Sequence, residues 1–183
     1  ATGGIGGVHQ GAETSFDISA DLHELATSPV NVVAAGAKAI LDIPKTLEVL
    51  ETLGVPVIAY GQDEFPAFWS RESGLKAPLR LDDPAAIARS FRMRRALGLP
   101  GGQLIGNPVP PEAEIARAQM APVISDATAE AARQGITGKA VTPFLLGHIL
   151  TLTQGRSLAT NINLVRNNAR LAAAIACALG QSA

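Results

Sequence analysis

A single lysine, Lys38, occupies the position in the sequence that is best suited to covalent chemistry. It follows Asn31–Gly36 (NVVAAG), a run typical of a buried strand, and precedes the apolar residues AILDI. Ligand crevices in open parallel sheets lie beyond the carboxyl ends of the strands, which is where Lys38 would lie. Desolvation there would lower the pKa of its amine from the usual value of about 10.4 and leave it able to attack a carbonyl. The same position equally fits a lysine in the first turn of a helix whose ammonium reaches solvent.

Three acidic residues, Glu13, Asp17 and Asp21, recur at intervals of four residues. If this stretch is helical, the three carboxylates share one face and repel one another. A hard divalent cation such as Mg²⁺ or Mn²⁺, bound through oxygen, would relieve that repulsion. The alternative is structural: Asp17 or Ser19 caps the helix that follows, while Glu13 is solvated. The spacing by itself favours the structural alternative.

The glycine-rich segment Gly3–Gly11 matches neither of the common nucleotide-binding motifs. A dinucleotide fingerprint starting at Gly4 would need glycine where His9 stands, and a P-loop would need lysine where Ala12 stands. The segment is therefore either a phosphate-binding nest of backbone amides beside Thr2 or a flexible turn. Such loops usually follow a strand, and none precedes this one. We therefore expect a processed chain or a fragment whose first part lies elsewhere.

Two further segments carry residue types that could line a site. Asparagine is a poor helix former, yet four asparagines crowd one predicted helix: Asn161, Asn163, Asn167 and Asn168. We expect some of them to face a ligand or a neighbouring loop. Phe65–Trp69 (FPAFW) gathers several of the few aromatic residues and is either a packed loop or a lid over a site.

These residues must be positioned by short apolar runs that alternate with helical patterns. Predicted strands cover residues 31–35, 55–60 and 103–106, and a helical pattern over residues 37–53 joins the first two. Within that pattern, an aspartate and a proline at positions 42 and 44 can restart a helix. Further helices are expected over residues 83–97, 111–134, 142–154 and 157–179. The pattern predicts the α/β class, with a parallel sheet and a helical C-terminal extension.

Composition narrows the classes of partner. The chain has 183 residues, enough for one substantial core, and we expect a single α/β domain over residues 1–183. A formal net charge of −1 offers no basic surface for a nucleic acid polymer. No apolar stretch reaches the roughly 20 residues of a membrane span, so no membrane partner is expected. The single cysteine, Cys177, lies in an apolar run that suits a small buried residue, which favours a reducing, cytoplasmic setting.

Six segments in order along nearly the whole chain carry a resemblance to a known family. They read ATGGIGGVH, DISADLHEL, AGAKAILDIPKTLEVLETLGVPV, FPAFWSRESG, GKAVTPFLLG and SLATNINLVRNNA. Together they resemble the pseudouridine-5′-phosphate glycosidase family, also called the indigoidine synthase A-like family. The resemblance implies a three-layer α/β/α fold with a mainly parallel sheet, a homotrimer and a divalent metal, typically Mn²⁺. It also implies cleavage of the C–C glycosidic bond of pseudouridine 5′-phosphate to uracil and ribose 5-phosphate.

The same resemblance implies roles for individual residues. Lys38 would be the nucleophile that forms an imine with ribose C1′, and Asp17 would lie at the metal. The substrate-binding residues implied by the resemblance are Thr2, Ser19, Ala20, Asp21 and Asn161.

Two departures from the family pattern bear on activity. The family usually has arginine after the histidine of the glycine-rich segment, and Gln10 stands there in this chain, which weakens any local anion contact. Family members also carry an N-terminal region that supplies a glutamate general acid and a substrate-binding lysine. That region is absent from this sequence, so we expect the chain to need it for activity, for instance as a second chain. Two other functions stay open: a Schiff-base lyase or aldolase acting on another sugar phosphate, and a non-catalytic fragment that binds a phosphosugar or a partner chain.

Overall fold

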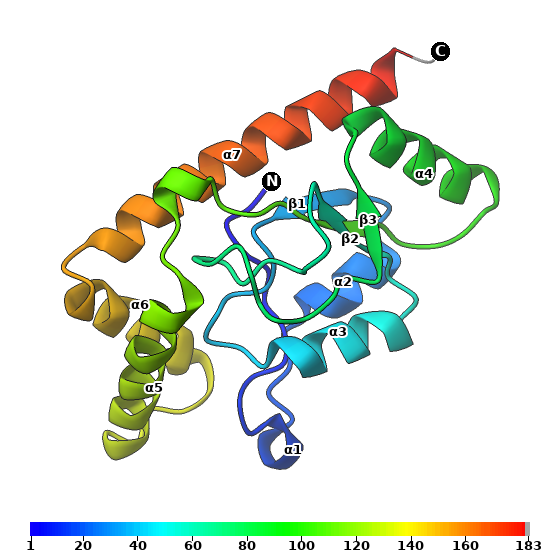
Figure 1. Ribbon diagram of the computed structural model, residues 1–183. Helices are drawn as coiled ribbons and strands as arrows, with labels where there is room; N and C mark the ends of the chain where they lie inside the picture. Colours follow the sequence, from blue (N-terminus) through cyan, green and yellow to red (C-terminus); the bar gives the residue numbers. More distant parts are fainter. Residues whose placement is uncertain (182–183) are drawn as a thin grey trace.

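Four short strands form a parallel sheet at the centre of the molecule (Figure 1). The computed structural model describes residues 1–181. In spatial order the strands are β1 (Asn31–Ala34), β4 (Gln103–Gly106), β2 (Val57–Tyr60) and β3 (Leu79–Leu81). Each neighbouring pair runs parallel, with Val33 opposite Ile105 and Ile58 opposite Leu79. Because parallel strands end at the same edge, the loops that follow β1, β2 and β4 meet there.

Helices cover both faces of this sheet, because successive side chains of a strand point to opposite sides. The covering helices are α4 (Pro84–Ala96) and α7 (Arg156–Gly180) on one face, and α2 (Asp21–Thr27) and α3 (Ile43–Thr52) on the other. Val33 and Ile105 join the apolar cluster formed with α4 and α7. Ala34 and Leu104 join the larger cluster formed with α2 and α3. The chain therefore has the three-layer α/β/α fold that the family resemblance implied.

The remaining helices lie outside these layers. They are α1 (Ala12–Ser15), α5 (Arg117–Arg133), α6 (Val141–Leu152) and the 3₁₀ turns η1 (Pro111–Ala113) and η2 (Gly138–Ala140). Helices α5 and α6 pack against each other, and α6 leads into α7, which crosses the molecule (Figure 1). The predicted helical C-terminal extension is thus confirmed. Within residues 1–181, every helix is too short or too polar to cross a membrane.

The helix predicted over residues 37–53 begins only at Ile43. Gly36 has a φ of +87°, and a Cβ there would collide with the backbone of a neighbouring loop, so the chain turns sharply as it leaves β1. The residues that follow pair with the N-terminal segment, since the Lys38 amide donates a hydrogen bond to the Ile5 carbonyl. This pairing with a distant segment replaces the predicted first turns of the helix.

The helix predicted over residues 111–134 is also interrupted. Its first turn is η1, and α5 begins only at Arg117. Between them Ile115 is buried, and its amide donates a hydrogen bond to the Trp69 carbonyl, which holds the backbone out of the helix. Strand β3 has no counterpart among the predicted strands, because three partly exposed residues at a sheet edge show no clear alternation.

The aromatic segment Phe65–Trp69 is a packed loop and not a lid. Phe65, Phe68 and Trp69 are all buried. The rings of Phe68 and Trp69 meet edge to face with 4.9 Å between their centroids. The indole nitrogen of Trp69 also donates to the Ser157 carbonyl at 3.2 Å, which fastens this loop to the start of α7.

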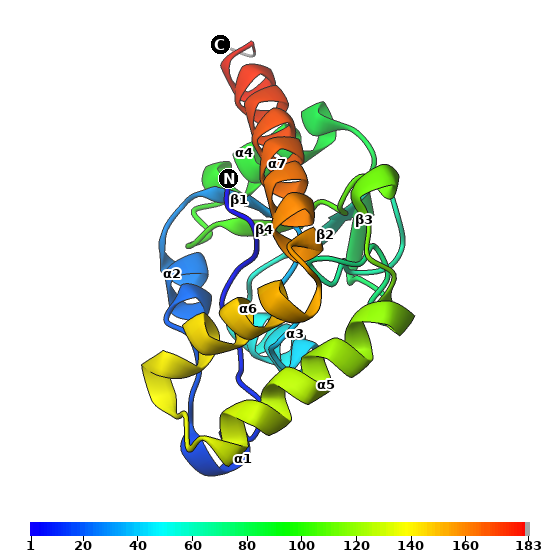
Figure 2. The same cartoon turned by 90° about the vertical axis from the view of Figure 1, so that its left-hand side faces the viewer.

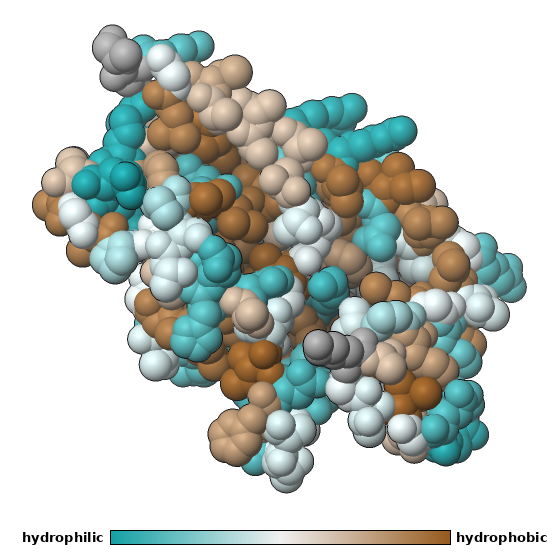
Figure 3. All heavy atoms as spheres, turned by 180° about the vertical axis from the view of Figure 1, so that it is seen from behind, coloured by the Kyte–Doolittle hydropathy of each residue, from teal (hydrophilic) through white to brown (hydrophobic). Residues whose placement is uncertain are grey.

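Cys177 is exposed, which corrects the expectation of a buried thiol. The residues of α7 that pack on the sheet include Leu171 and Ile175. Cys177 comes two residues after Ile175 and therefore lies about 200° further around the helix. Apolar character in that run does not by itself mean burial, and apolar residues are also mixed with polar ones over the surface seen from behind (Figure 3).

Candidate functional site

The start of the glycine-rich segment runs alongside β1 and pairs with it through single bonds and isolated bridges; we call residues 2–8 the glycine strand, although they are not one of the four strands of the sheet. The Thr2 amide donates to the Val33 carbonyl at 3.0 Å, and the Ala35 amide donates to the Gly3 carbonyl at 2.8 Å. Ile5 continues the parallel pairing with the residues after β1. Figure 2 shows this dark blue segment running from the N-terminus down to α1. The pairing through Thr2, Gly3 and Ile5 fixes the start of the segment, so it is not a flexible turn. A phosphate nest of backbone amides beside Thr2 stays a prediction.

Glycine is needed along this strand because other elements approach its backbone closely. A Cβ on Gly4 would lie 2.7 Å from the ring of Phe68. A Cβ on Gly6 would lie 2.6 Å from the Cβ of Ser19. Both distances are too short for real carbon contacts, so any side chain would push these neighbours away. The glycines therefore allow the start of α2 to lie directly against the strand.

Ser19, Ala20 and Asp21 form the turn that begins α2, and the turn is bound to the glycine strand. The Gly6 amide donates to Asp21 Oδ2 at 2.7 Å, and the Ser19 amide donates to the Gly7 carbonyl at 2.9 Å. Within the turn, the Ser19 hydroxyl accepts a hydrogen bond from the Asp21 amide at 3.2 Å. The N-cap residue of α2 is Ala20, which makes no side-chain cap bond, so the predicted cap by Asp17 or Ser19 is wrong.

Lys38 lies in the loop that follows β1, as predicted. Its amide donates to the Ile5 carbonyl at 3.1 Å, and its carbonyl accepts from the Leu41 amide at 3.0 Å. Ile5 precedes Gly6, which binds Asp21, so two successive residues of the glycine strand join the Lys38 loop to the start of α2. The side chain of Lys38 is partly buried, and among the described residues no carboxylate forms an ion pair with it. The alternative of a lysine in the first turn of a helix is wrong, because α3 begins five residues later.

The three regularly spaced acidic residues do not share a helical face. Helix α1 ends at Ser15, and Phe16 adopts a left-handed backbone with a φ of 53°. Asp17 is consequently outside the helix, where its carbonyl accepts from the His9 amide at 3.0 Å. Its carboxylate lies 3.9 Å from His9 Nδ1 and is 39% exposed. In residues 1–181 no three His, Cys, Asp or Glu side chains are grouped to hold a metal.

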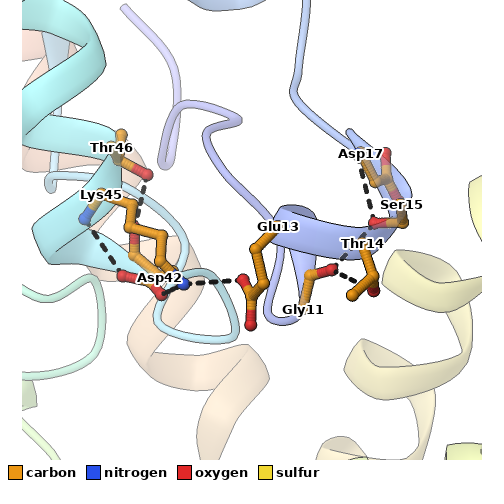
Figure 4. A network of polar contacts seen from close by, with 8 residues as sticks. All are labelled: Gly11, Glu13, Thr14, Ser15, Asp17, Asp42, Lys45 and Thr46. Carbon is orange, nitrogen blue, oxygen red and sulfur yellow. Dashed lines mark hydrogen bonds and ion pairs between the residues drawn. The ribbon is translucent and has the colours of Figure 1, made fainter.

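Glu13 is engaged in an ion-pair network with α3 (Figure 4). Lys45 Nζ lies 2.9 Å from Glu13 Oε2 and 2.9 Å from Asp42 Oδ2. The hydrogen bond from Lys45 lowers the pKa of Glu13, and the two carboxylates, Glu13 foremost, raise the pKa of Lys45. At Asp42 partial burial opposes ionisation, but the hydrogen bonds from Lys45 outweigh it and lower the pKa. Glu13 therefore ties α1 to α3. The hypothesis of a shared face required Glu13 to lie beside Asp17, and this is wrong.

Thr2 lies in the glycine strand and Asn161 on α7, which packs against that strand. Helix α7 reaches the glycine strand, since a Cβ on Gly3 would lie 3.5 Å from the Leu164 side chain. Asn161 comes about one turn earlier on α7. Its side-chain oxygen is buried and has no hydrogen-bond partner among the described residues. Thr2 is exposed and, together with Asp21, lines a hollow of about 380 Å³.

A larger cleft, of about 720 Å³, lies elsewhere. It is lined by Ala39–Leu41, Ile43 and Pro44, by part of the loop over residues 67–75 and by α5. Among the described residues that line it, none is a predicted site residue, although the cleft begins one position after Lys38. We place the candidate site at the glycine strand, because Thr2 and Asp21 line one hollow there, the Lys38 backbone binds the same strand, and the walls of the larger cleft are mainly apolar.

Two buried polar residues next to the glycine strand have no place in the sequence prediction. Thr46 is fully buried, and its Oγ1 accepts from the Val8 amide at 2.9 Å. Asn107 is nearly buried, and its Nδ2 donates to Asn168 Oδ1 at 3.0 Å. Asn107 had a usable signal, as a polar residue directly after a buried strand, whereas Thr46 resembles any polar residue of a helix. Asn168 confirms that some asparagines of α7 face neighbouring segments.

The sequence of this chain is similar to that of a known protein family. The family model described as indigoidine synthase A like protein matches residues 1–178. The chain belongs to the indigoidine synthase A-like family. A relative named pseudouridine-5′-phosphate glycosidase from Paracoccus denitrificans is 76% identical over 179 residues, which are 98% of this chain and 59% of the relative. A relative of the same name from Roseobacter denitrificans is 69% identical over 98% of this chain and 58% of its own length. The chain thus spans about 59% of the curated family member from Paracoccus.

Two solved structures of the family share the fold. The prealnumycin C-glycosynthase AlnA, in complex with ribulose 5-phosphate, superposes with a TM-score of 0.92 at 35% identity, covering 98% of this chain and 59% of AlnA. An indigoidine synthase A-like protein from Thermotoga maritima superposes with a TM-score of 0.86 at 36% identity, over 98% of this chain and 58% of that protein. The α/β/α fold is therefore that of the family.

Proposed function

We propose that this chain forms the lysine-bearing part of a pseudouridine-5′-phosphate glycosidase, which cleaves the C–C glycosidic bond of its substrate to uracil and ribose 5-phosphate. The observation that carries this proposal is that the Lys38 backbone and the Asp21 carboxylate bind adjacent residues of one strand. Relatives 76% and 69% identical to the chain bear the name of this activity. The ribulose 5-phosphate bound to AlnA supports a phosphosugar as the substrate class.

Lys38 supplies the nucleophile in this proposal. A C–C glycosidic bond has no leaving oxygen to protonate, so catalysis by two carboxylates does not transfer easily to it. The neutral Lys38 amine bonds to C1′ while the C1′–O4′ bond breaks, and the ring oxygen takes a proton from the glutamate general acid that the resemblance assigns to the family's N-terminal region. The bond from C1′ to uracil C5 then breaks, its electron pair stays with uracil, and the proton on nitrogen passes to that carbon. The C1′=N imine that remains is hydrolysed by water to ribose 5-phosphate and the free amine.

The surrounding residues bind and orient the phosphosugar. We assign this role to Thr2, Ser19, Ala20, Asp21 and Asn161. The buried Asn161 oxygen without a partner suits a sugar hydroxyl that donates a hydrogen bond. The Asp21 carboxylate binds the Gly6 amide through Oδ2, so its other oxygen can accept from a second donor.

A divalent metal, Mn²⁺ in the first instance, would be held by Asp17. The potential metal ligands here are one carboxylate, 39% exposed, and a histidine, His9, whose Nδ1 lies 3.9 Å away. Such a set fits a hard cation that keeps most of its waters, and it does not fit a closed cage of protein ligands. The cation would supply positive charge beside an anionic substrate. His9 lies close enough to orient the Asp17 carboxylate.

The decisive experiment uses a full-length chimera. In the Paracoccus denitrificans relative, the matched 179 residues are replaced by those of this chain. We expect the chimera to convert pseudouridine 5′-phosphate to equal amounts of uracil and ribose 5-phosphate, measured by chromatography. Lys38→Met should abolish both products. A folded chimera that releases no uracil, beside an active parent protein, would contradict the proposal.

A second candidate is the formation of a C–C glycosidic bond from a phosphosugar. The observation that favours it is the likeness to AlnA, which is named a C-glycosynthase. The same imine, run in reverse, would accept a carbon nucleophile at C1′. The chimera would then join ribose 5-phosphate to an added acceptor.

Trapping of an imine with other sugar phosphates but without uracil release would favour the lyase or aldolase alternative. Binding of a sugar phosphate without any imine trapping would favour the non-catalytic fragment.

Two further features stay predictions that rest on the family resemblance: a homotrimer, and a separate second chain carrying the remaining family region. A cytoplasmic location stays a prediction that rests on the single cysteine. Light scattering on the chimera tests the trimer. Intact mass and N-terminal sequencing of material purified from its natural source test whether a second polypeptide accompanies the chain.

A further inference from the structure

A buried polar junction joins α7 and the ends of two strands to the glycine strand. Asn168 is completely buried, and its Nδ2 donates to the Thr2 carbonyl at 2.8 Å and to the Gly3 carbonyl at 3.3 Å. Its Oδ1 accepts from Asn107 Nδ2 at 3.0 Å. Asn107 directly follows β4 and is 4% exposed, and its amide donates to the Ala34 carbonyl at the end of β1 at 2.8 Å. The carboxamide of Asn168 therefore links the last residues of β1 and β4 to the first residues of the glycine strand.

The chemistry of this junction requires an amide side chain. A carboxamide donates through nitrogen and accepts through oxygen at the same time, and Asn168 uses both. A carboxylate would set oxygen against the Thr2 and Gly3 carbonyls, and an apolar side chain would leave buried polar groups without partners. Because one nitrogen holds two successive carbonyls, it restricts both the position and the rotation of the peptide group between them.

Thr2 is fixed from both sides while its side chain stays open to solvent. Its amide donates to the Val33 carbonyl at 3.0 Å, and its carbonyl accepts from Asn168. The residue itself is exposed. A side chain that is free to meet a ligand, on a backbone held by buried groups, is the arrangement of a preorganised binding residue.

We propose that Asn168 is a positioning residue for phosphosugar binding that acts through Thr2. Asn168 does not contact the substrate. It holds the Thr2 backbone at the position along β1 where the Thr2 side chain contacts the phosphosugar. The inference rests on the proposed function, in which Thr2 binds substrate. The neighbouring Asn167 is a matched control, because its Nδ2 donates to the Pro108 carbonyl at 3.1 Å and fastens α7 without any recorded bond to the glycine strand.

The kinetic test uses the full-length chimera. Asn168→Ala is expected to raise the KM for pseudouridine 5′-phosphate by about tenfold or more and to change kcat by less than about threefold, because it disturbs binding and not the Lys38 chemistry. Asn167→Ala should leave KM within about twofold of the parent value. In a Thr2→Ala background, Asn168→Ala should have no further effect on KM, since the residue that it positions is gone. An equal rise of KM in both backgrounds, or the same rise in Asn167→Ala, would overturn the inference.

A second measurement is independent of the reaction. Hydrogen exchange of the peptide that contains Thr2–Ile5 should become faster in Asn168→Ala and stay unchanged in Asn167→Ala. Faster exchange in a chimera that releases no uracil would refute the proposed function and leave the positioning role in place. Unchanged exchange would overturn the positioning role whatever the activity. If Asn168→Ala fails to fold, Asn107→Ala is the second variant, because it removes only the donor to Asn168 Oδ1. It should raise KM and the hydrogen-exchange rate of the Thr2–Ile5 peptide by smaller amounts. A variant that raises neither would overturn the inference.

Discussion

Lys38 is fixed through its backbone, while its amine makes no ion pair with the described residues. We predict that borohydride, added to the chimera with ribose 5-phosphate, leaves a covalent mass increment on the peptide that contains Lys38. Lys38→Arg should abolish both trapping and turnover, because the guanidinium stays protonated and cannot form an imine. Lys45→Arg is the control and should trap normally. A label on Lys45 in the parent chimera, or an active Lys38→Arg variant, would reject the assignment.

Asp17 gives a second prediction at the scale of the residue. Asp17→Ala should lose Mn²⁺ dependence together with activity, while the free energy of unfolding changes by no more than about 0.5 kcal/mol. The fold should survive because the hydrogen bond to the His9 amide comes from the Asp17 carbonyl and not from its side chain. Titration calorimetry with Mn²⁺ measures the loss, with Glu13→Ala as the control. Unchanged Mn²⁺ affinity in Asp17→Ala would move the metal to Asp21 or Glu13.

Single residues were predictable from the sequence where a local pattern placed them. Lys38 follows a buried apolar run, and the structure puts it in the loop after β1. The prediction that Glu13 and Asp17 share a helical face was wrong, because one left-handed residue, Phe16, ends α1 between them. The crowded asparagines of α7 predicted polar contacts, but not that the Asn161 oxygen would be buried without a partner among the described residues, since that depends on what α7 meets in three dimensions.

Among the elements, the turn after β1 depends on one glycine. Gly36 and Gly54 both have positive φ, +87° and +69°, but only at Gly36 would a Cβ meet neighbouring backbone, with the Pro66 carbonyl carbon at 2.9 Å. Gly54→Ala should cost about 1–2 kcal/mol from its left-handed backbone. Gly36→Ala should cost about 1–3 kcal/mol more, because the Pro66 loop must also move. Urea unfolding measures the difference, and equal losses in the two variants would contradict it.

The tie between α1 and α3 should depend on pH. The pKa of Glu13 is lowered from 4.5 by its hydrogen bond to Lys45, so its contribution is present above pH 4.5 and is lost as the pH falls further. The pKa of Lys45 is raised from 10.5, so its contribution is complete below pH 10.5 and is lost at higher pH. Lys45→Met should therefore lower the urea midpoint slightly near neutral pH and not at either extreme. A difference that persists down to about pH 3 would show that the effect is packing and not charge.

Starts of helices were predictable, whereas interruptions were not. Asp42 and Asp83 each precede a helix with proline in its first turn, and both side chains accept hydrogen bonds from backbone amides as caps. Two stretches predicted to be helical are not helical, because the Lys38 amide bonds to Ile5 and the Ile115 amide bonds to Trp69. Each partner lies more than thirty residues away in the chain, so a local pattern carries no trace of it.

At the scale of the whole molecule, alternation of strands and helices was enough to predict the class of fold. It did not predict that the glycine-rich segment would pair with β1 and the residues after it, because glycine carries no side-chain pattern from which such pairing could be read. That segment is where the ends of the chain meet: α7 holds its first residues through Asn168, and α2 binds its middle through Asp21. The site therefore depends on the complete three-layer arrangement and not on any one motif.

The last prediction compares the activity of this chain with that of the full-length chimera. The resemblance assigns a glutamate general acid and a substrate-binding lysine to a region outside the segments matched here, and the chain spans 59% of the Paracoccus relative. Loss of a positioned general acid typically lowers the rate by about 10²- to 10⁴-fold. We therefore expect the kcat/KM of the 183-residue chain to be at least about 10²-fold below that of the chimera. Circular dichroism should show equal helical content in the two proteins, so that the loss is not due to unfolding. Full turnover by the purified chain would place the proton donor within it, with Asp21 and Glu13 as the first residues to replace.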